Sequence, residues 1–141
     1  MIRIIDENED EILNKELLWE MANITPRVTG LPSMIQSLAK GKDRVSHAAR
    51  VKVMTPNFGY VPIQIDPEVK LPNSMKHKDF QKQDNECINS AIKYIEKYKD
   101  VFLAHWNDEI EDDQLHDILK GKLSLEQAKQ DVIEYRSKLG E

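Results

Sequence analysis

Cysteine is nearly absent from this chain, since Cys87 is the single one among 141 residues. One thiol excludes an internal disulfide and a zinc site built from several cysteines, and its position beside Ile88 favours a structural role. Glycine is also sparse, and its five copies form none of the motifs G-x-x-x-x-G-K-[S/T], G-x-G-x-x-G or G-x-S-x-G. The common signatures of nucleotide binding and serine hydrolysis are therefore missing, so we expect no cofactor and regard an enzyme as the weaker hypothesis.

Long apolar stretches are missing as well. The chain has no run of about 18 apolar residues, so the sequence predicts no membrane span. Its beginning lacks the basic region, the sustained apolar stretch and the small-residue cleavage site of a signal peptide. Together with the single cysteine, these features predict a cytoplasmic protein that has no membrane partner. The apolar fraction of 40% and the charged fraction of 32% are typical of a globular domain.

The length of the chain indicates one folded domain with an addition at each end. We expect an acidic helical extension over residues 1–22, an α+β core domain over residues 23–122 and a C-terminal helix packed on the core over residues 123–141. Apolar side chains lie on one side of the helix expected in the extension, at Ile12, Leu13, Leu17, Leu18 and Trp19. Because Met21 would also serve as a start, residues 1–20 are either an appended segment or a genuine helix that covers the sheet.

The core domain is expected to contain a three-stranded antiparallel β-meander, with strands over residues 33–39, 47–54 and 60–66. The prolines of residues 23–32 favour an extended linker before it. A turn centred on Asn57 places Val53 opposite Val61, so that the apolar faces of the last two strands coincide. Arg50 and Lys52 then lie on the opposite face, toward solvent. Pro62 cannot donate to the ladder, which predicts an edge strand or a bulge there.

The C-terminal half reads as helical. Apolar residues recur every three or four positions over residues 83–107, which predicts one long amphipathic helix covering one face of the sheet, with a kink or break allowed near residues 98–100. A short helix is expected after Asp112 or Asp113 and ends at Gly121. The sequence Ser124-Leu-Glu-Gln127 is a capping box and opens the last helix.

Basic residues gather in one part of this acidic chain. The formal net charge is −5, yet residues 31–56 carry five basic side chains and one acidic one. This basic loop and strand, with one aromatic residue on the following strand, form a candidate surface for an acidic protein or for phosphate groups. Its members are Lys40, Lys42, Arg44, Arg50, Lys52 and Tyr60.

Three stretches together resemble an uncharacterised bacterial family of short proteins. They are Gly30-Leu-Pro32, then His47-Ala-Ala-Arg-Val-Lys-Val53, then Tyr98-Lys-Asp-Val-Phe-Leu-Ala-His-Trp-Asn-Asp-Glu-Ile110. That family has a G-x-P opening, a strand reading H-x-A-R-[I/V]-K-V and a helix ending in L-x-x-W-x-x-x-I. The resemblance covers roughly residues 24–120 and implies an α+β fold with a start near Met21. A weaker similarity is to small domains found in toxin–antitoxin-like gene pairs.

Histidines provide the remaining candidates for chemistry. His47 has the right side chain for general acid–base catalysis, but it shares the parity of Val51, so Arg50 points to the other face. His105 and Glu109 are four residues apart on one helical face, as metal ligands can be, and His116 lies beyond an expected break. Helix capping and solvation explain this acidic cluster better than a metal does.

These observations leave three functional hypotheses. The first is a regulatory or protein-interaction module, such as one half of a toxin–antitoxin-like pair, that docks an acidic protein partner through its basic sheet face. The second is a protein that binds RNA or DNA or cleaves RNA without a metal, with His47 as base and Arg44 steadying phosphate. The third is a structural homodimer, formed through the strand that contains Pro62 or through the helix that contains Trp19.

Overall fold

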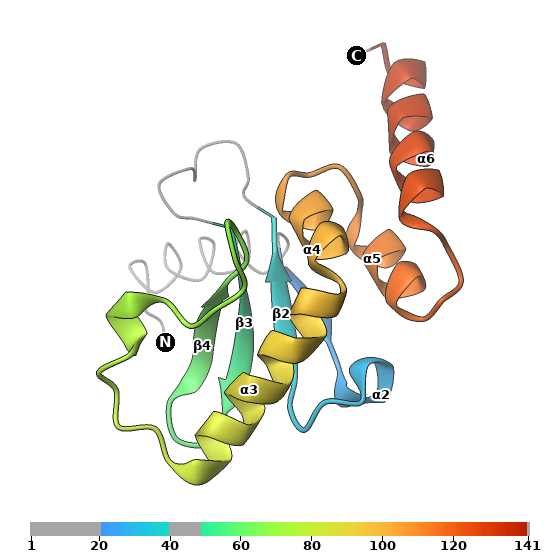
Figure 1. Ribbon diagram of the computed structural model, residues 1–141. Coiled ribbons are helices and arrows are strands. Elements are labelled where there is room, and N and C mark those ends of the chain that lie inside the picture. Colours follow the sequence, from blue (N-terminus) through green and yellow to red (C-terminus); the bar gives the residue numbers. More distant parts are fainter. Residues whose placement is uncertain (1–20, 40–48, 141) are drawn as a thin grey trace, which may run out of the picture.

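The structure is a computed structural model that describes residues 21–39 and 49–140. It has an α+β fold in which the strands form one antiparallel sheet in the order β1-β2-β3-β4, with helices packed on one face (Figure 1). The strands are β1 (Met21–Ile24), β2 (Ile35–Leu38), β3 (Arg50–Thr55) and β4 (Gly59–Gln64). The helices are α2 (Pro26–Thr29), the 3₁₀ turn η1 (Asn73–Met75), α3 (Lys82–Lys97), α4 (Lys99–Trp106), α5 (Asp112–Leu119) and α6 (Leu125–Lys138).

The expectation of three strands is wrong, because β1 adds a fourth. It pairs antiparallel with β2, and Asn23 lies opposite Gln36. Ala22 and Ile24 are buried on the helix-covered side, which makes the strand part of the core. The extended linker expected over residues 23–32 is also wrong, since one helical turn, α2, begins at Pro26. Proline suits the first position of a helix because that N–H has no partner inside the helix.

The predicted register of the last two strands is confirmed. Val53 lies opposite Val61, Lys52 opposite Pro62 and Arg50 opposite Gln64. Pro62 lies on β4, at one edge of the sheet, so the edge alternative holds. The structure starts β4 at Gly59, whose φ of 65° is the left-handed conformation that a residue without Cβ adopts readily.

The single long helix expected over residues 83–107 is two helices. Tyr98 separates α3 from α4 with φ −114° and ψ 29°, outside the helical region. The break lies within the stretch where the sequence allowed one. Because the chain turns there, α3 packs on β3 while α4 packs on β2, as seen from the crossing of the two helices over the sheet in Figure 1.

Asp84 fastens the beginning of α3 to the turn between β3 and β4. Its carboxylate is fully buried and accepts hydrogen bonds from the backbone N–H of Asn57 (2.9 Å), the amide of Asn57 (3.1 Å) and the backbone N–H of Gln81 (2.9 Å). Burial alone would raise the pKa of this carboxyl, but the three donors outweigh it and hold the pKa below its usual value. The turn and the helix are therefore held together by one ionised side chain.

The hydrophobic core lies between the sheet and the helices. Alternate residues of β3 and β4 face it, because successive side chains of a strand point to opposite faces. On the helix side, Phe102 is the largest fully buried residue. Other fully buried members are Ile24, Ile35, Val51, Val61, Ile63, Ile65, Ile95 and Leu115.

Tyr94 is a half-buried residue of α3 whose hydroxyl oxygen is buried and has no hydrogen-bond partner among the residues that the structure describes. Burial, with a smaller contribution from Tyr98, raises the pKa of Tyr94 to about 12. An unsatisfied buried hydroxyl costs free energy, so Tyr94→Phe should leave the free energy of unfolding unchanged or raise it by about 1 kcal/mol. Urea denaturation at neutral pH measures this.

Tyr135→Phe is the matched control for that measurement, because the Tyr135 side chain is 62% exposed and its hydroxyl is already hydrated. We expect no change in its free energy of unfolding. A clear loss of stability in Tyr94→Phe alone would contradict the prediction, since it would mean that the hydroxyl has a partner.

The last helix, α6, extends away from the sheet (Figure 1). Its beginning is capped as predicted, because the Ser124 hydroxyl accepts from the backbone N–H of Gln127 at 3.1 Å. The Gln127 side chain donates to Asp131 instead of completing the capping box. Ala128 and Val132 are buried, so the first half of α6 is anchored. Within the described residues, no helix has both the length and the apolar character needed to cross a membrane.

Candidate functional site

Side chains of mixed character lie on the face of the sheet opposite α3. Burial alternates along β3 and β4, with every second residue in the core and the others half-buried. We call the half-buried set the second sheet face, and its members are Arg50, Lys52, Met54, Tyr60, Pro62 and Gln64. Helices α3 and α4 lie on the other face, and none of the helices that the structure describes covers this set (Figure 1).

Two neighbouring cations dominate the second sheet face. Arg50 and Lys52 are two residues apart on β3, so their side chains point the same way. Burial of the ammonium group and, to a smaller extent, the charge of Arg50 lower the pKa of Lys52. Among the residues that the structure describes, neither cation forms an ion pair, and the buried Nε of Arg50 has no acceptor. An anion placed between them would relieve both the repulsion and the missing hydrogen bond.

Apolar groups border this cation pair. Pro62 lies directly opposite Lys52, and Met54 lies opposite Tyr60. The Tyr60 hydroxyl is 3.5 Å from the sulfur of Met34, which holds the ring against the sheet. The sequence prediction that Arg50, Lys52 and Tyr60 share one face agrees with this register. A ligand for this surface would need both negative charge and apolar area.

Four of the predicted site residues lie outside the described residues. They are Lys40, Lys42 and Arg44 of the basic loop and His47, the candidate base. The part of the candidate surface that the structure describes therefore consists of Arg50, Lys52 and Tyr60.

The three metal candidates take part in separate contacts. His105 is buried against Ser37 and Asp112, whereas Glu109 lies 3.7 Å from the ammonium of Lys129. His116 reaches the backbone carbonyl oxygens of Asp112 and Asn23, each at 3.0 Å. Helix α4 ends at Trp106, so the helical spacing between residues 105 and 109 is lost. No group of three metal-ligating side chains comes together within the described residues.

The buried contacts of His105 form a relay that the sequence analysis missed. The Ser37 hydroxyl lies 2.8 Å from Nδ1 of His105, and Nε2 of His105 lies 2.6 Å from a carboxylate oxygen of Asp112. A ring protonated on Nε2 donates to Asp112 and accepts from the Ser37 hydroxyl, which satisfies all three groups. The relay joins β2, α4 and the first residue of α5.

Serine, histidine and aspartate in hydrogen-bond contact are also the components of a hydrolase triad. Here Ser37 lies within a central strand and is 0% exposed, and His105 is 1% exposed. A substrate carbonyl therefore has no path to the hydroxyl. A hollow of about 370 Å³ borders the relay on the Asp112 side, and acidic residues dominate its lining. The geometry supports a structural tie between the sheet and two helices.

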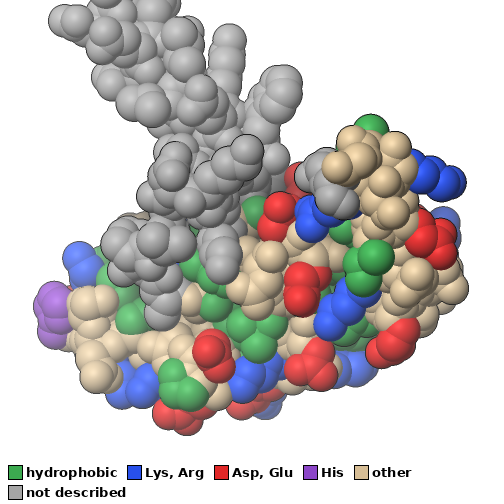
Figure 2. All heavy atoms as spheres, turned by 90° about the horizontal axis from the view of Figure 1, so that it is seen from above, with side chains coloured by type: hydrophobic (Ala, Val, Ile, Leu, Met, Phe, Trp, Pro, Cys, Tyr) green, Lys and Arg blue, Asp and Glu red, His purple; other side chains and the backbone are tan. Residues whose placement is uncertain are grey.

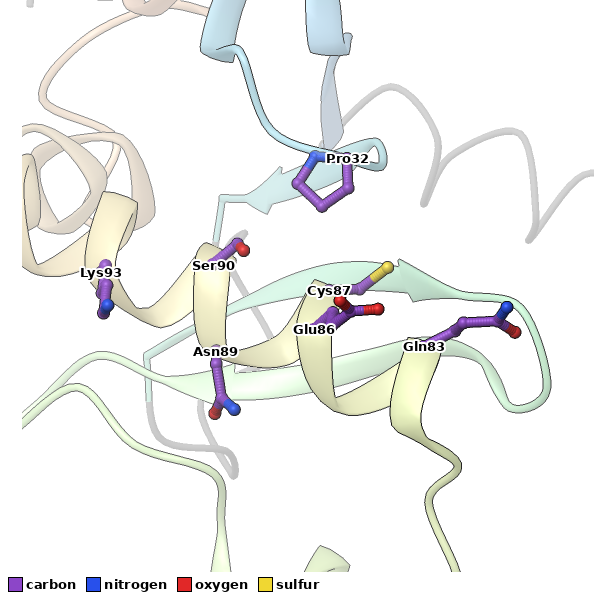
Figure 3. Close-up of a pocket in the computed structure, with 7 residues that line it drawn as sticks. All are labelled: Pro32, Gln83, Glu86, Cys87, Asn89, Ser90 and Lys93. Carbon is purple, nitrogen blue, oxygen red and sulfur yellow. The ribbon is translucent and has the colours of Figure 1, made fainter.

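Another hollow, of about 500 Å³, lies along α3 (Figure 3). Cys87 and Ser90 point toward Pro32, whereas Asn89 and Lys93 point away from it. The polar groups therefore do not converge on a common point. Cys87 is 7% exposed and belongs to the core, in agreement with its expected structural role.

No protein-family model, curated protein or solved structure matches this chain. The resemblance to the bacterial family stays a prediction from sequence motifs. Function must therefore be argued from the side chains of this structure.

Proposed function

We propose that this protein is an interaction module whose second sheet face binds an acidic, partly apolar segment of a protein partner. The observation that carries the proposal is the adjacent pair Arg50 and Lys52, two half-buried cations without an ion-pair partner among the described residues. Charge complementarity of this kind gives specificity and speeds association. A regulatory role, as in a toxin–antitoxin-like pair, is compatible with such a module.

A protein segment suits this face better than a nucleic acid does. Single strands are held by a longer basic groove with several stacking rings, whereas the described part of this face offers two cations and one ring, Tyr60. Met54 and Pro62 add apolar area that a phosphate backbone would leave unused. Figure 2 shows Lys and Arg side chains interspersed with Asp and Glu side chains over the described part of the side that it presents, without a continuous basic track there.

Substitution of both cations should weaken binding strongly. We expect Arg50→Ala/Lys52→Ala to weaken binding of a fluorescently labelled Glu- and Leu-rich helical peptide by at least about tenfold, since each desolvated charge pair contributes roughly 2 kcal/mol or more. Fluorescence anisotropy at two salt concentrations measures the effect. A labelled mixed-sequence RNA is titrated in parallel, and a denaturing gel then shows whether it has been cut.

The matched control is Lys82→Ala/Lys93→Ala, which removes two exposed cations from α3 on the other side of the sheet. It should bind the peptide as the wild type does. Equal affinity of the wild type and Arg50→Ala/Lys52→Ala would overturn the proposal. Binding of the RNA alone would replace the protein partner with a nucleic acid, and cut RNA would establish the enzyme hypothesis.

A further inference from the structure

The net charge of the chain resides in its first 20 residues. They carry seven acidic and two basic side chains, a formal charge of −5, which equals the charge of the whole chain. Residues 21–141 are therefore neutral in sum, with 18 basic and 18 acidic side chains. An acidic segment thus directly precedes Met21, the first residue of β1 in the sheet that displays Arg50 and Lys52.

We propose that residues 1–20 are themselves an occupant of the second sheet face, so that a partner must displace them in order to bind. This inference rests on the proposed function, because it assigns a competitor to the same surface. It identifies that competitor by chemistry, as an acidic and amphipathic segment of the same chain.

The segment can reach the face. Strands of a sheet lie about 4.8 Å apart, so β3 is roughly 10 Å from β1 and β4 roughly 15 Å from it. A helix formed by residues 8–20 would be about 20 Å long, which is enough to cross from the beginning of β1 over β3 and β4. In the sheet order β1-β2-β3-β4, such a helix would pass over β2 on its way to β3 and β4.

The side chains of the segment match those of the face. On a helix, Glu9, Ile12, Leu13 and Glu16 fall on one side, because their spacings are three, four and seven. Two apolar residues therefore lie between two carboxylates on that side. The second sheet face likewise combines charge with apolar area, since Arg50 and Lys52 lie beside Met54 and Pro62. Docking would pair the charges and remove apolar area from water in a single contact.

Attachment to the same chain makes the segment a strong competitor. A tethered ligand has an effective concentration in the millimolar range when its linker spans the distance. A free partner of equal intrinsic affinity would therefore bind weakly until the segment is released. The expected behaviour is a module whose affinity depends on the state of its first 20 residues.

Trp19 reports directly on docking in the full-length chain. The second tryptophan, Trp106, is buried in the core, so the difference between the wild type and Trp19→Phe isolates the fluorescence of Trp19 without altering the core. We expect Trp19 emission to be blue-shifted, and its quenching by acrylamide to be weaker, relative to the chain unfolded in urea. Arg50→Glu/Lys52→Glu should shift both quantities to the unfolded values, and Lys82→Glu/Lys93→Glu should change neither.

A charge swap separates docking from damage to the sheet. Adding Glu9→Lys/Glu16→Lys to Arg50→Glu/Lys52→Glu should restore the protection of Trp19, which a misfolded sheet cannot do. Protection that grows with protein concentration, together with a dimeric mass by light scattering, would assign the segment to a second copy and overturn the intramolecular proposal. Trp19 quenched as in urea in the wild type would overturn it as well.

The peptide titration distinguishes failure of this inference from failure of the proposed function. Leu13→Ser/Leu17→Ser should release the segment and increase the affinity for the acidic peptide at least about tenfold, as expected for loss of an intramolecular competitor. If Trp19 is unprotected and the peptide binds the wild type, the inference fails while the function stands. If Trp19 is protected and Leu13→Ser/Leu17→Ser still does not bind the peptide, the proposed function is wrong. The segment then only covers the sheet.

Discussion

His105→Ala should lower the free energy of unfolding by about 3–5 kcal/mol, which is among the largest losses that a single substitution can cause in a chain of this size. Removal of the ring leaves a cavity between β2 and α4. It also leaves the buried Ser37 hydroxyl without its hydrogen-bond partner, Nδ1 of His105 at 2.8 Å. The loss therefore combines a packing cost with an unsatisfied hydrogen-bonding group. Urea denaturation followed by circular dichroism measures it.

The control is His77→Ala, because His77 is exposed in the loop before α3. Its free energy of unfolding should stay within about 0.5 kcal/mol of the wild type, as for surface substitutions in general. Ser37→Ala and Asp112→Asn, alone and together, then form a double-mutant cycle across the ring. Additive losses in that cycle would contradict the relay, since coupled groups are expected to be non-additive.

Asp84→Asn should produce the second-largest loss, a fall in Tm of about 5 °C or more at neutral pH. The substituted amide can accept through one atom only, and its NH₂ group would face the N–H donors of Asn57 and Gln81. A buried carboxylate with three donors is thus exchanged for a group with the wrong polarity. Glu96→Gln, on the exposed side of the same helix, should leave Tm unchanged.

The contribution of Asp84 to the stability of the fold should decrease as the pH falls. Its pKa in the folded protein lies below the usual 3.8, so the ionised form stabilises the fold at every pH above about 4. The contribution is lost as the pH falls below that value and the carboxylate becomes protonated. The difference in Tm between the wild type and Asp84→Asn should therefore shrink on acidification. A constant difference from pH 7 to pH 3 would show that the charge of Asp84 does not matter.

The sequence was sufficient to predict those parts of the fold in which local pattern and turn chemistry agree. Alternation along β3 and β4, with Asn57 in the turn and Gly59 at the beginning of β4, predicted the register of Arg50 and Lys52 correctly. Ser124 identified the beginning of α6 for the same reason, because a cap needs only neighbouring residues. These signals are local and physical, so no relative was needed to interpret them.

The remaining parts depend on contacts between distant residues. β1 has four residues, too few for alternation to be recognised, and burial of Ala22 and Ile24 against the helices makes it a strand. Ser37 and His105 are 68 positions apart, and nothing in their surroundings indicates that they meet. Its spacing to Glu109 predicted that His105 belongs to an acidic cluster on the surface of a helix. In the structure the His105 ring instead points into the protein, toward Ser37.

The two edges of the sheet have a consequence for strand addition and aggregation. On β4, the N–H of Gln64 points outward and is paired with the carbonyl of Lys70, and Pro62, which has the same orientation, has no N–H to offer. On β1, the outward carbonyl of Asn23 accepts from the ring of His116. Within the described residues, these features remove some of the free donors and acceptors that another strand would use as a template. These contacts make both described edges poorer templates for β-linked growth, whereas no described helix covers the second sheet face.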